Sequence, residues 1–100
     1  MDVNTELILI RITGLDRPGL TASFTEILSG YDVTIMDIGQ ANIHSTLSLG
    51  ILFKSLKSDS GNILKELLFK ASDLGVNIRF YPVPVEEYEE WRSEERRVGK

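Results

Sequence analysis

Apolar side chains recur along the chain with two different periods, and these periods predict four strands and two helices. Apolar residues at every second position are typical of a strand with one buried face. Apolar residues three or four positions apart are typical of an amphipathic helix. The strands are predicted over residues 6–13, 33–44, 46–54 and 76–81. Apolar residues spaced from Leu20 to Tyr31 predict the first helix, of about three turns, and those from Ile63 to Leu74 predict the second.

Glycine, proline and small polar residues mark the predicted helix ends. Pro18 suits the first turn of the first helix, where no amide hydrogen is needed, and Gly30 suits the position just past its end. The second helix follows a polar break that offers Asp59 or Ser60 as its start signal. Gly75 is expected to end that helix.

The order of these elements, β-α-β-β-α-β, predicts an α+β protein with the ferredoxin-like fold. Two right-handed crossovers around a central hairpin, turning at residues 44–45, give a four-stranded antiparallel sheet with both helices on one face. We expect this domain to span residues 5–85. We expect residues 86–100 to be an acidic, charged tail or linker, with residues 92–100 in part foreign to the native protein.

The face of the sheet opposite the helices is predicted to be apolar as well. If Ile8, Ile10 and Ile12 face the helices, the neighbouring apolar residues must face away from them. The residues expected on that outer face are Leu7, Leu9, Met36 and Ile38. A solvated face should be more polar than this. We therefore expect a second module to cover it, and a bulge near Gly39, where the parity shifts.

Composition and charge exclude several classes of function. The chain has 100 residues, 42% of them hydrophobic, which is enough for one core and one domain. Its net charge of −4 argues against a binder of nucleic-acid backbones. The absence of cysteine excludes disulfides and thiolate metal sites. With no signal-peptide pattern and no membrane-length apolar run, we expect a soluble, cytoplasmic domain that binds no membrane.

Single residues give no sign of a catalytic or metal centre. His44 is the only histidine, and a stable metal site needs three or four ligands. Ser45 beside it lacks an acid and base arranged as a triad. A sheet that recognises RNA would need stacking aromatic residues with basic neighbours, which the middle strands do not offer. We expect no catalytic residue and no metal ligand in this chain.

The loop between the first strand and first helix holds the densest candidate chemistry. Gly14 and Gly19 allow sharp turns and close approach to a small molecule. The amide hydrogens of Gly19 and Leu20, at the helix start, could bind a carboxylate, and Asp16 could bind an ammonium group. The same residues also suit a simple turn in which Asp16 caps the helix and Arg17 is solvated. The pattern alone leaves both interpretations open.

Three stretches resemble a known family. ITGLDRPGLTASFTEIL resembles the first strand, ligand loop and first helix of the ACT family, small regulatory domains that bind amino acids. YDVTIMDIGQANIHSTLSLGILF and ELLFKASDLGVNIRFYPV are similar to the N-terminal ACT region of bacterial phosphoserine phosphatases, those of Bacteroidetes-like bacteria in particular. The resemblance implies a serine-like amino-acid effector, bound at the seam between one module and another ACT module or a second copy.

The resemblance also assigns residues to that seam. The loop would contribute Gly14, Asp16, Pro18, Gly19 and Leu20, and the facing strand Asp37, Ile38, Gly39 and Gln40. Phosphatase chemistry in that family belongs to a haloacid-dehalogenase-type domain with a D-x-D-x-T motif and magnesium. No D-x-D occurs here, so the resemblance implies the regulatory part of an L-serine biosynthetic enzyme, with no cofactor of its own.

Two other functions stay open at this stage. The chain could be an ACT-like module that only dimerises and binds no ligand, since pairing and sensing would use the same residues. It could also be a small acylphosphatase-like enzyme, which needs an arginine–asparagine phosphate cradle. Arg17 is the single hint of such a cradle.

Overall fold

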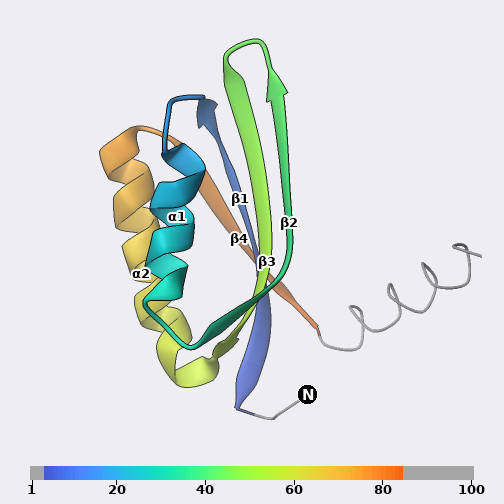
Figure 1. The fold of residues 1–100 in the computed structure, drawn as a ribbon. Helices are drawn as coiled ribbons and strands as arrows, with labels where there is room; N and C mark the ends of the chain where they lie inside the picture. The colour runs from blue at the N-terminus through green and yellow to red at the C-terminus, as the bar shows by residue number, and fades with distance from the viewer. Residues whose placement is uncertain (1–3, 85–100) are drawn as a thin grey trace, which may run out of the picture.

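The computed structural model describes residues 4–84 and has the predicted ferredoxin-like fold, with two helices packed on one face of an antiparallel sheet (Figure 1). The strands lie in the order β2-β3-β1-β4, so β1 and β3 are central and β2 and β4 are edges. The elements are β1 (Thr5–Leu15), α1 (Leu20–Ser29), β2 (Val33–Ile43), β3 (Thr46–Leu56), α2 (Lys57–Leu74) and β4 (Asn77–Val83). The predicted tail, residues 86–100, lies outside the described residues. Neither helix of the described part is long and apolar enough to cross a membrane.

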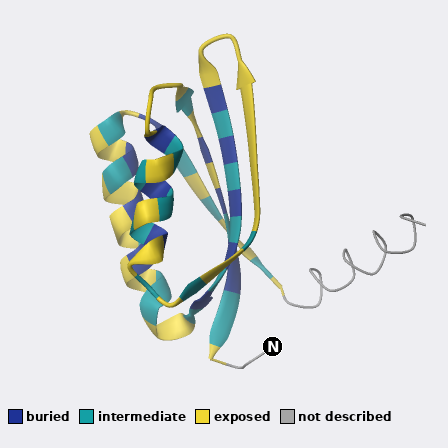
Figure 2. Cartoon of the chain, viewed as in Figure 1, coloured by how far each residue is buried: buried dark blue, intermediate teal, exposed yellow. Residues whose placement is uncertain are grey.

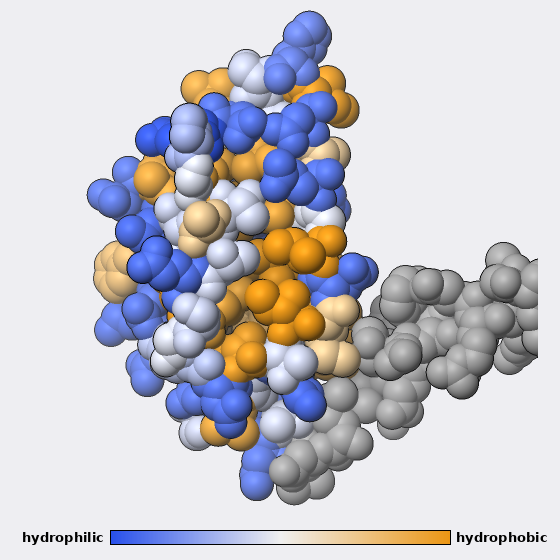
Figure 3. Space-filling view, viewed as in Figure 1, coloured by the Kyte–Doolittle hydropathy of each residue, from blue (hydrophilic) through white to orange (hydrophobic). Residues whose placement is uncertain are grey.

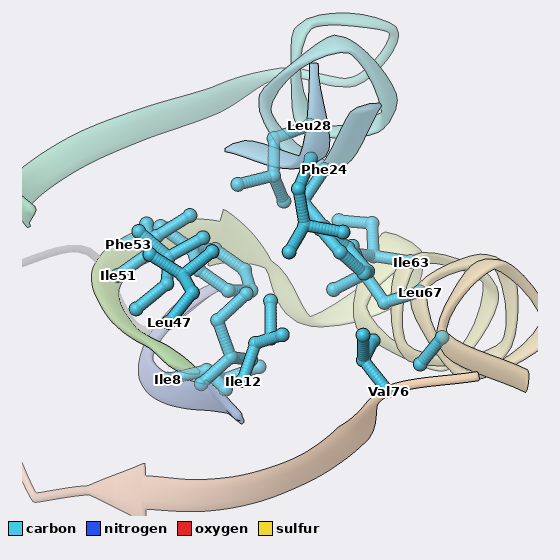
Figure 4. Close-up of a cluster of buried hydrophobic side chains, with 14 residues drawn as sticks. Ile8, Ile12, Phe24, Leu28, Leu47, Ile51, Phe53, Ile63, Leu67 and Val76 are labelled. Carbon is cyan, nitrogen blue, oxygen red and sulfur yellow. The ribbon is translucent and has the colours of Figure 1, made fainter. Parts of the chain in front are cut away.

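The hydrophobic core lies between the helices and the two central strands (Figure 4). Every second residue of β1 and β3 points into it, as the alternating pattern predicted. The core residues are Ile8, Ile10 and Ile12 of β1, Leu47, Leu49, Ile51 and Phe53 of β3, Leu20, Phe24 and Leu28 of α1, Ile63, Leu67 and Ala71 of α2, and Val76. Burial of one such large side chain contributes about 1.5–3 kcal/mol.

Strand β1 is longer than predicted and shortens the loop that follows it. Gly14 pairs with Leu47 and Leu15 with Thr46, so the connection to α1 is only residues 16–19. A Cβ on Gly14 would lie 2.7 Å from Val76 Cγ1, so this glycine permits close packing of β1 against the start of β4. Pro18 precedes the helix and is not in its first turn, contrary to the prediction, because Gly19 is the N-cap.

Helix α2 begins at Lys57, directly after β3, and the polar break predicted before it is wrong. The Lys57 amide donates to the Asn4 carbonyl oxygen at 2.8 Å, a tertiary contact that replaces a side-chain cap. Ser60 instead donates through Oγ to a Glu6 carboxylate oxygen at 2.6 Å. The other predicted helix end is confirmed, because Gly75 follows α2 in the left-handed conformation with φ of 70°.

The predicted bulge exists but lies three residues earlier, at Met36. The register of β2 against β3 shifts between Ile35 and Asp37. The extra residue moves Ile38 to the helix side of the sheet, where it pairs with core residue Ile51. The expectation that Ile38 faces away from the helices is therefore wrong.

The sheet face opposite the helices, here called the far face, is apolar over one end only. The apolar end consists of Leu7, Leu9, Leu52, Tyr81 and Val83, which register brings together. The centre carries the polar residues Arg11, Thr13, Ser48, Asn77 and Arg79. Register thus places Leu7 and Leu9 on the far face as predicted, although Leu7 is only 1% exposed. The prediction is wrong for the face as a whole, because polar residues of β1, β3 and β4 occupy its centre.

Candidate functional site

The loop of residues 16–19 is a tight connection held against the β2–β3 hairpin. The Asp16 amide donates to the Ser45 carbonyl oxygen at 2.7 Å, and His44 and Ser45 form the predicted two-residue turn. Gly19 has φ of 79°, the left-handed conformation that starts α1 and that favours glycine. All four loop residues are exposed. The loop therefore presents its polar groups to solvent from a fixed position.

A chain of four polar side chains, here called the Asp16 network, joins the loop and α1 to β2. Thr21 Oγ1 donates to Gln40 Oε1 at 2.9 Å, and Gln40 Nε2 donates to Asn42 Oδ1 at 3.0 Å. Asn42 Nδ2 then donates to Asp16 Oδ2 at 2.6 Å. Each side chain in this chain thus donates to the next, and the last donates to the Asp16 carboxylate. One oxygen of Asp16 is held in this way, and the other has no hydrogen-bond partner within residues 4–84.

The start of α1 follows this loop and supplies backbone amide hydrogens. The helix has no side-chain cap, so Asp16 does not cap it. The Leu20 amide makes only a long bond, 3.3 Å, to the Arg17 carbonyl oxygen. Gly19 accepts from the Ser23 amide and side chain through its carbonyl oxygen. A helix N-terminus without a side-chain cap attracts an anion. The loop and the helix start that follows it thus offer one group that suits a cation and one that suits an anion.

Arg17 is bound away from this site. Its Nη2 donates to the Leu74 carbonyl oxygen at 2.7 Å, at the end of α2. A cation near a helix C-terminus interacts favourably with the helix dipole. The arginine is therefore neither simply solvated nor free for the phosphate cradle considered above.

The structure brings some of the predicted site residues together and separates others. Asp16, Pro18, Gly19 and Gln40 lie around the loop. The Leu20 side chain is buried in the core, and Gly14 lies within β1, so each could reach a ligand only through its backbone. Register places Asp37 and Gly39 on the far face, because they pair with Leu52 and Gly50. The Asp37 side chain accepts a hydrogen bond from the next amide, that of Ile38, at 2.9 Å.

Two residues of the network were missed by the sequence reasoning. Asn42 lies two positions after Gln40 and therefore on the same face of β2. That spacing could have indicated it. Thr21 lies in the first turn of α1. Nothing local in the sequence indicates that its hydroxyl reaches Gln40, because the two residues meet only through the packing of α1 beside β2.

Strand β2 forms an open edge beside this site. Figure 2 shows that β2 is exposed along most of its length, whereas neighbouring β3 alternates between buried and half-buried residues. Ile35 and Ile38 point to the helix side and are 42% and 45% exposed. Apolar side chains gather on the side of the molecule that carries β2 (Figure 3). An unpaired strand edge with exposed apolar side chains is a surface for pairing with another chain.

A separate cavity of about 520 Å³ lies between the two helices. Tyr31 donates its hydroxyl hydrogen to a Glu66 carboxylate oxygen there. This hydrogen bond raises the pKa of Tyr31, and partial burial and the negative charge of Glu66 raise it further. The cavity is lined by Ser23, Glu26, Ile27, Gly30, Tyr31, Glu66 and Lys70, and none of them belongs to the Asp16 network.

Comparison with known proteins gives one family and several similar chains. A family model described as ACT domain matches residues 6–81. A protein of Pyrobaculum aerophilum, UPF0237 protein PAE3582, is 28% identical over 85 residues, which cover 83% of this chain and 94% of that protein. Phosphoserine phosphatase SerB2 of Mycobacterium tuberculosis is 38% identical over 45 residues. That match covers 45% of this chain and only 11% of the phosphatase.

Solved structures share the fold. One assigned as a glycine cleavage system transcriptional repressor superposes with a TM-score of 0.76 at 18% identity, covering 80% of this chain and 47% of that one. The ACT domain protein from Streptococcus pneumoniae superposes with a TM-score of 0.67 at 20% identity, covering 77% of this chain and 89% of that one. At this level of identity the likeness establishes the fold alone.

Proposed function

Because the chain belongs to the ACT domain family, whose members are regulatory amino-acid-binding modules, we propose that it senses a small, serine-like amino acid. The supporting observation is the arrangement around the loop. The exposed Asp16 carboxylate is held by Asn42, and its loop leads directly into the start of α1, which has no side-chain cap. An amino acid carries an ammonium and a carboxylate group, and these two features of the loop match its two charges.

The effector would lie at a seam between two modules. Strand β2 is an edge strand with exposed apolar residues, so another ACT module or a second copy of this chain can extend the sheet there. Its second strand would then face the loop of this chain. Of the four β2 residues assigned to the seam, Gln40 and Ile38 face the helix side and would take part. Effector binding would favour one arrangement of the two modules, and that arrangement would bias an attached catalytic domain.

The parent protein in this proposal is a cytoplasmic phosphoserine phosphatase of L-serine biosynthesis. The partial match to the mycobacterial phosphatase supports the assignment, as do the stretches quoted from the sequence. Magnesium and catalysis would belong to the separate phosphatase domain, since this chain contains no D-x-D motif. Two measurements test the assignment. A D-x-D-x-T segment in the reading frame after Trp91 would support it, and magnesium-dependent phosphate release by the 100-residue chain would contradict it.

Sensing is tested by titrating the full chain with serine and glycine while recording amide chemical shifts. We expect saturable shifts at Gly19 and Leu20. Asp16→Asn removes the charge that binds the ammonium group and should weaken binding at least tenfold. Asp73→Asn, an equal charge change at an exposed residue of α2, is the matched control and should leave binding unchanged.

A ligand-free pairing module is the rival function. The open edge of β2 supports pairing whether or not a ligand binds. If no amide in the loop shifts on titration while sedimentation still reports a dimer, the chain pairs without sensing. If Asp16→Asn and Asp73→Asn bind serine equally, the proposed site is wrong even where the chain binds serine.

A further inference from the structure

Two arginines lie directly opposite one another on the far face, away from the Asp16 network. Arg11 of β1 pairs with Arg79 of β4 in the sheet register. Side chains at directly opposed positions have Cβ atoms about 4.5–5.5 Å apart, and like charges there repel. Both arginines are exposed, and neither makes a hydrogen bond or ion pair within residues 4–84. The arrangement therefore lacks the counter-charge that would make it favourable.

The surroundings of this pair are those of an anion site. A small cavity of about 200 Å³ is lined by Arg11, Thr13, Asn77, Arg79 and Tyr81. Thr13, Asn77 and Tyr81 add donors to those of the two guanidinium groups, since hydroxyl and amide side chains also donate hydrogen bonds. A guanidinium group binds phosphate or carboxylate through two parallel hydrogen bonds. Two such groups facing one cavity match a doubly charged oxyanion.

On the side of Arg11 away from Arg79, the residues in line with the pair have no side chains. In the sheet register, Arg11 lies opposite Gly50 of β3, and Gly50 lies opposite Gly39 of β2. A Cβ built on either glycine would meet nothing within 4 Å. The backbone is therefore bare beside the arginines, and a ligand larger than the anion itself has room to extend over these two strands.

Charge on the far face favours an anion although the whole chain is acidic. Its charged residues in the described strands are Arg11, Arg79 and Lys54, with Asp37 as the single carboxylate. Asp37 lies on the opposite edge strand, separated from Arg11 by β3. The net charge of the chain is −4, so this face is a local positive surface on a negative protein, which concentrates small anions.

We propose that the cavity at Arg11 and Arg79 is a second binding site, for a small dianionic oxyanion of the phosphate-monoester class. It is separate from the amino-acid site, because Arg11 and Arg79 lie on the far face whereas Asp16 is tied to the helix side of β2. The chemistry is binding only. Both guanidinium groups neutralise the anion, and Thr13, Asn77 and Tyr81 are placed to donate to its remaining oxygens.

The test is a titration of the full chain with inorganic phosphate at constant ionic strength, followed through the arginine Nε–H resonances. We expect saturable shifts of the Arg11 and Arg79 signals, and at least tenfold weaker binding in Arg11→Gln or Arg79→Gln. Lys54→Gln removes one positive charge from the same face and is the matched control, expected to retain binding. Acetate, with a single charge, should bind at least tenfold more weakly than phosphate.

Two results would overturn the proposal. Linear shifts of equal size in all variants mean charge screening and no site. The acidic residues at 86–90 could instead occupy the arginines from within the chain. If replacing those glutamates with glutamine moves the arginine signals, and phosphate gives no saturable shift in either chain, the site serves that segment and not a free anion.

Discussion

Gly14 offers the sharpest test of how the loop is positioned. The nearest atoms to a Cβ on Gly14 would all belong to Val76, with Cγ1 at 2.7 Å, Cβ at 3.0 Å and the backbone Cα at 3.3 Å. Gly14 lies in a central strand and Val76 is buried, so neither can easily move. Overpacking of this kind costs about 1–3 kcal/mol, and alanine recovers about 0.5–1 kcal/mol over glycine in a strand.

We therefore expect Gly14→Ala to lower the free energy of unfolding by about 1–2 kcal/mol, or the Tm by about 4–16 °C. Urea unfolding followed by circular dichroism measures the change in the free energy of unfolding. Val76→Ala alone removes two buried methyl groups and should cost about 1.6 kcal/mol. In the double variant the closest contact, with Val76 Cγ1, is gone, whereas the contacts with Val76 Cβ and Cα remain. The two losses should therefore fall short of additivity by about 0.5 kcal/mol or more.

Gly50→Ala is the matched control for this experiment. It lies in the neighbouring central strand, and its Cβ would meet nothing within 4 Å. It should be neutral or stabilising by about 0.5 kcal/mol. The reasoning is refuted if Gly14→Ala keeps the wild-type midpoint, or if the double variant loses the full sum of the single losses.

Three further predictions concern the network, the helix pair and a helix end. Asn42→Ala removes the donor that holds Asp16 and should cost about 0.5–1 kcal/mol at this exposed position, with faster hydrogen exchange at the Asp16 amide as the measurement. The pKa of Tyr31 is raised above its ordinary value of 10.0, so its stabilising effect is complete below pH 10 and is lost as pH rises through the higher folded-state value. Unfolding measured from pH 8 to 12 should show this loss in the wild type and not in Tyr31→Phe. Gly75→Ala should cost about 1–2 kcal/mol because φ is 70° there, whereas Gly30→Ala, at φ of −80°, should cost far less in the same assay.

The alternation of apolar residues was enough to predict the element order, the two central strands and the residues that form the core. It failed where an element end depends on a partner distant in sequence. Helix α2 begins at Lys57 because the Asn4 carbonyl oxygen accepts its amide hydrogen, and no local pattern contains that contact. The bulge at Met36 was misplaced for a similar reason. A bulge follows from the pairing register of β2 with β3, and the register becomes visible only when both strands are aligned.

At the candidate site, too, local features could be predicted from the sequence and contacts between distant segments could not. The glycines around Asp16 predicted a loop with sharp turns, and Gly19 does adopt the left-handed conformation there. The G-x-D-R-P-G-L motif did not reveal that Asn42 and Thr21 connect Asp16 with Gln40. Nor did it indicate that Gly14 serves packing against Val76. Apart from the bond between Gln40 and Asn42, these contacts join residues more than fifteen positions apart.

The sequence by itself determined the periodicity of each element, the fold that this order of elements permits, and the family. It did so because side-chain spacing and turn preferences are local properties of the chain. Only the tertiary structure decided which face each β2 residue occupies, which residues hold Asp16, and that Arg11 meets Arg79. These outcomes depend on strand register, and one bulged residue reverses the orientation of every side chain after it.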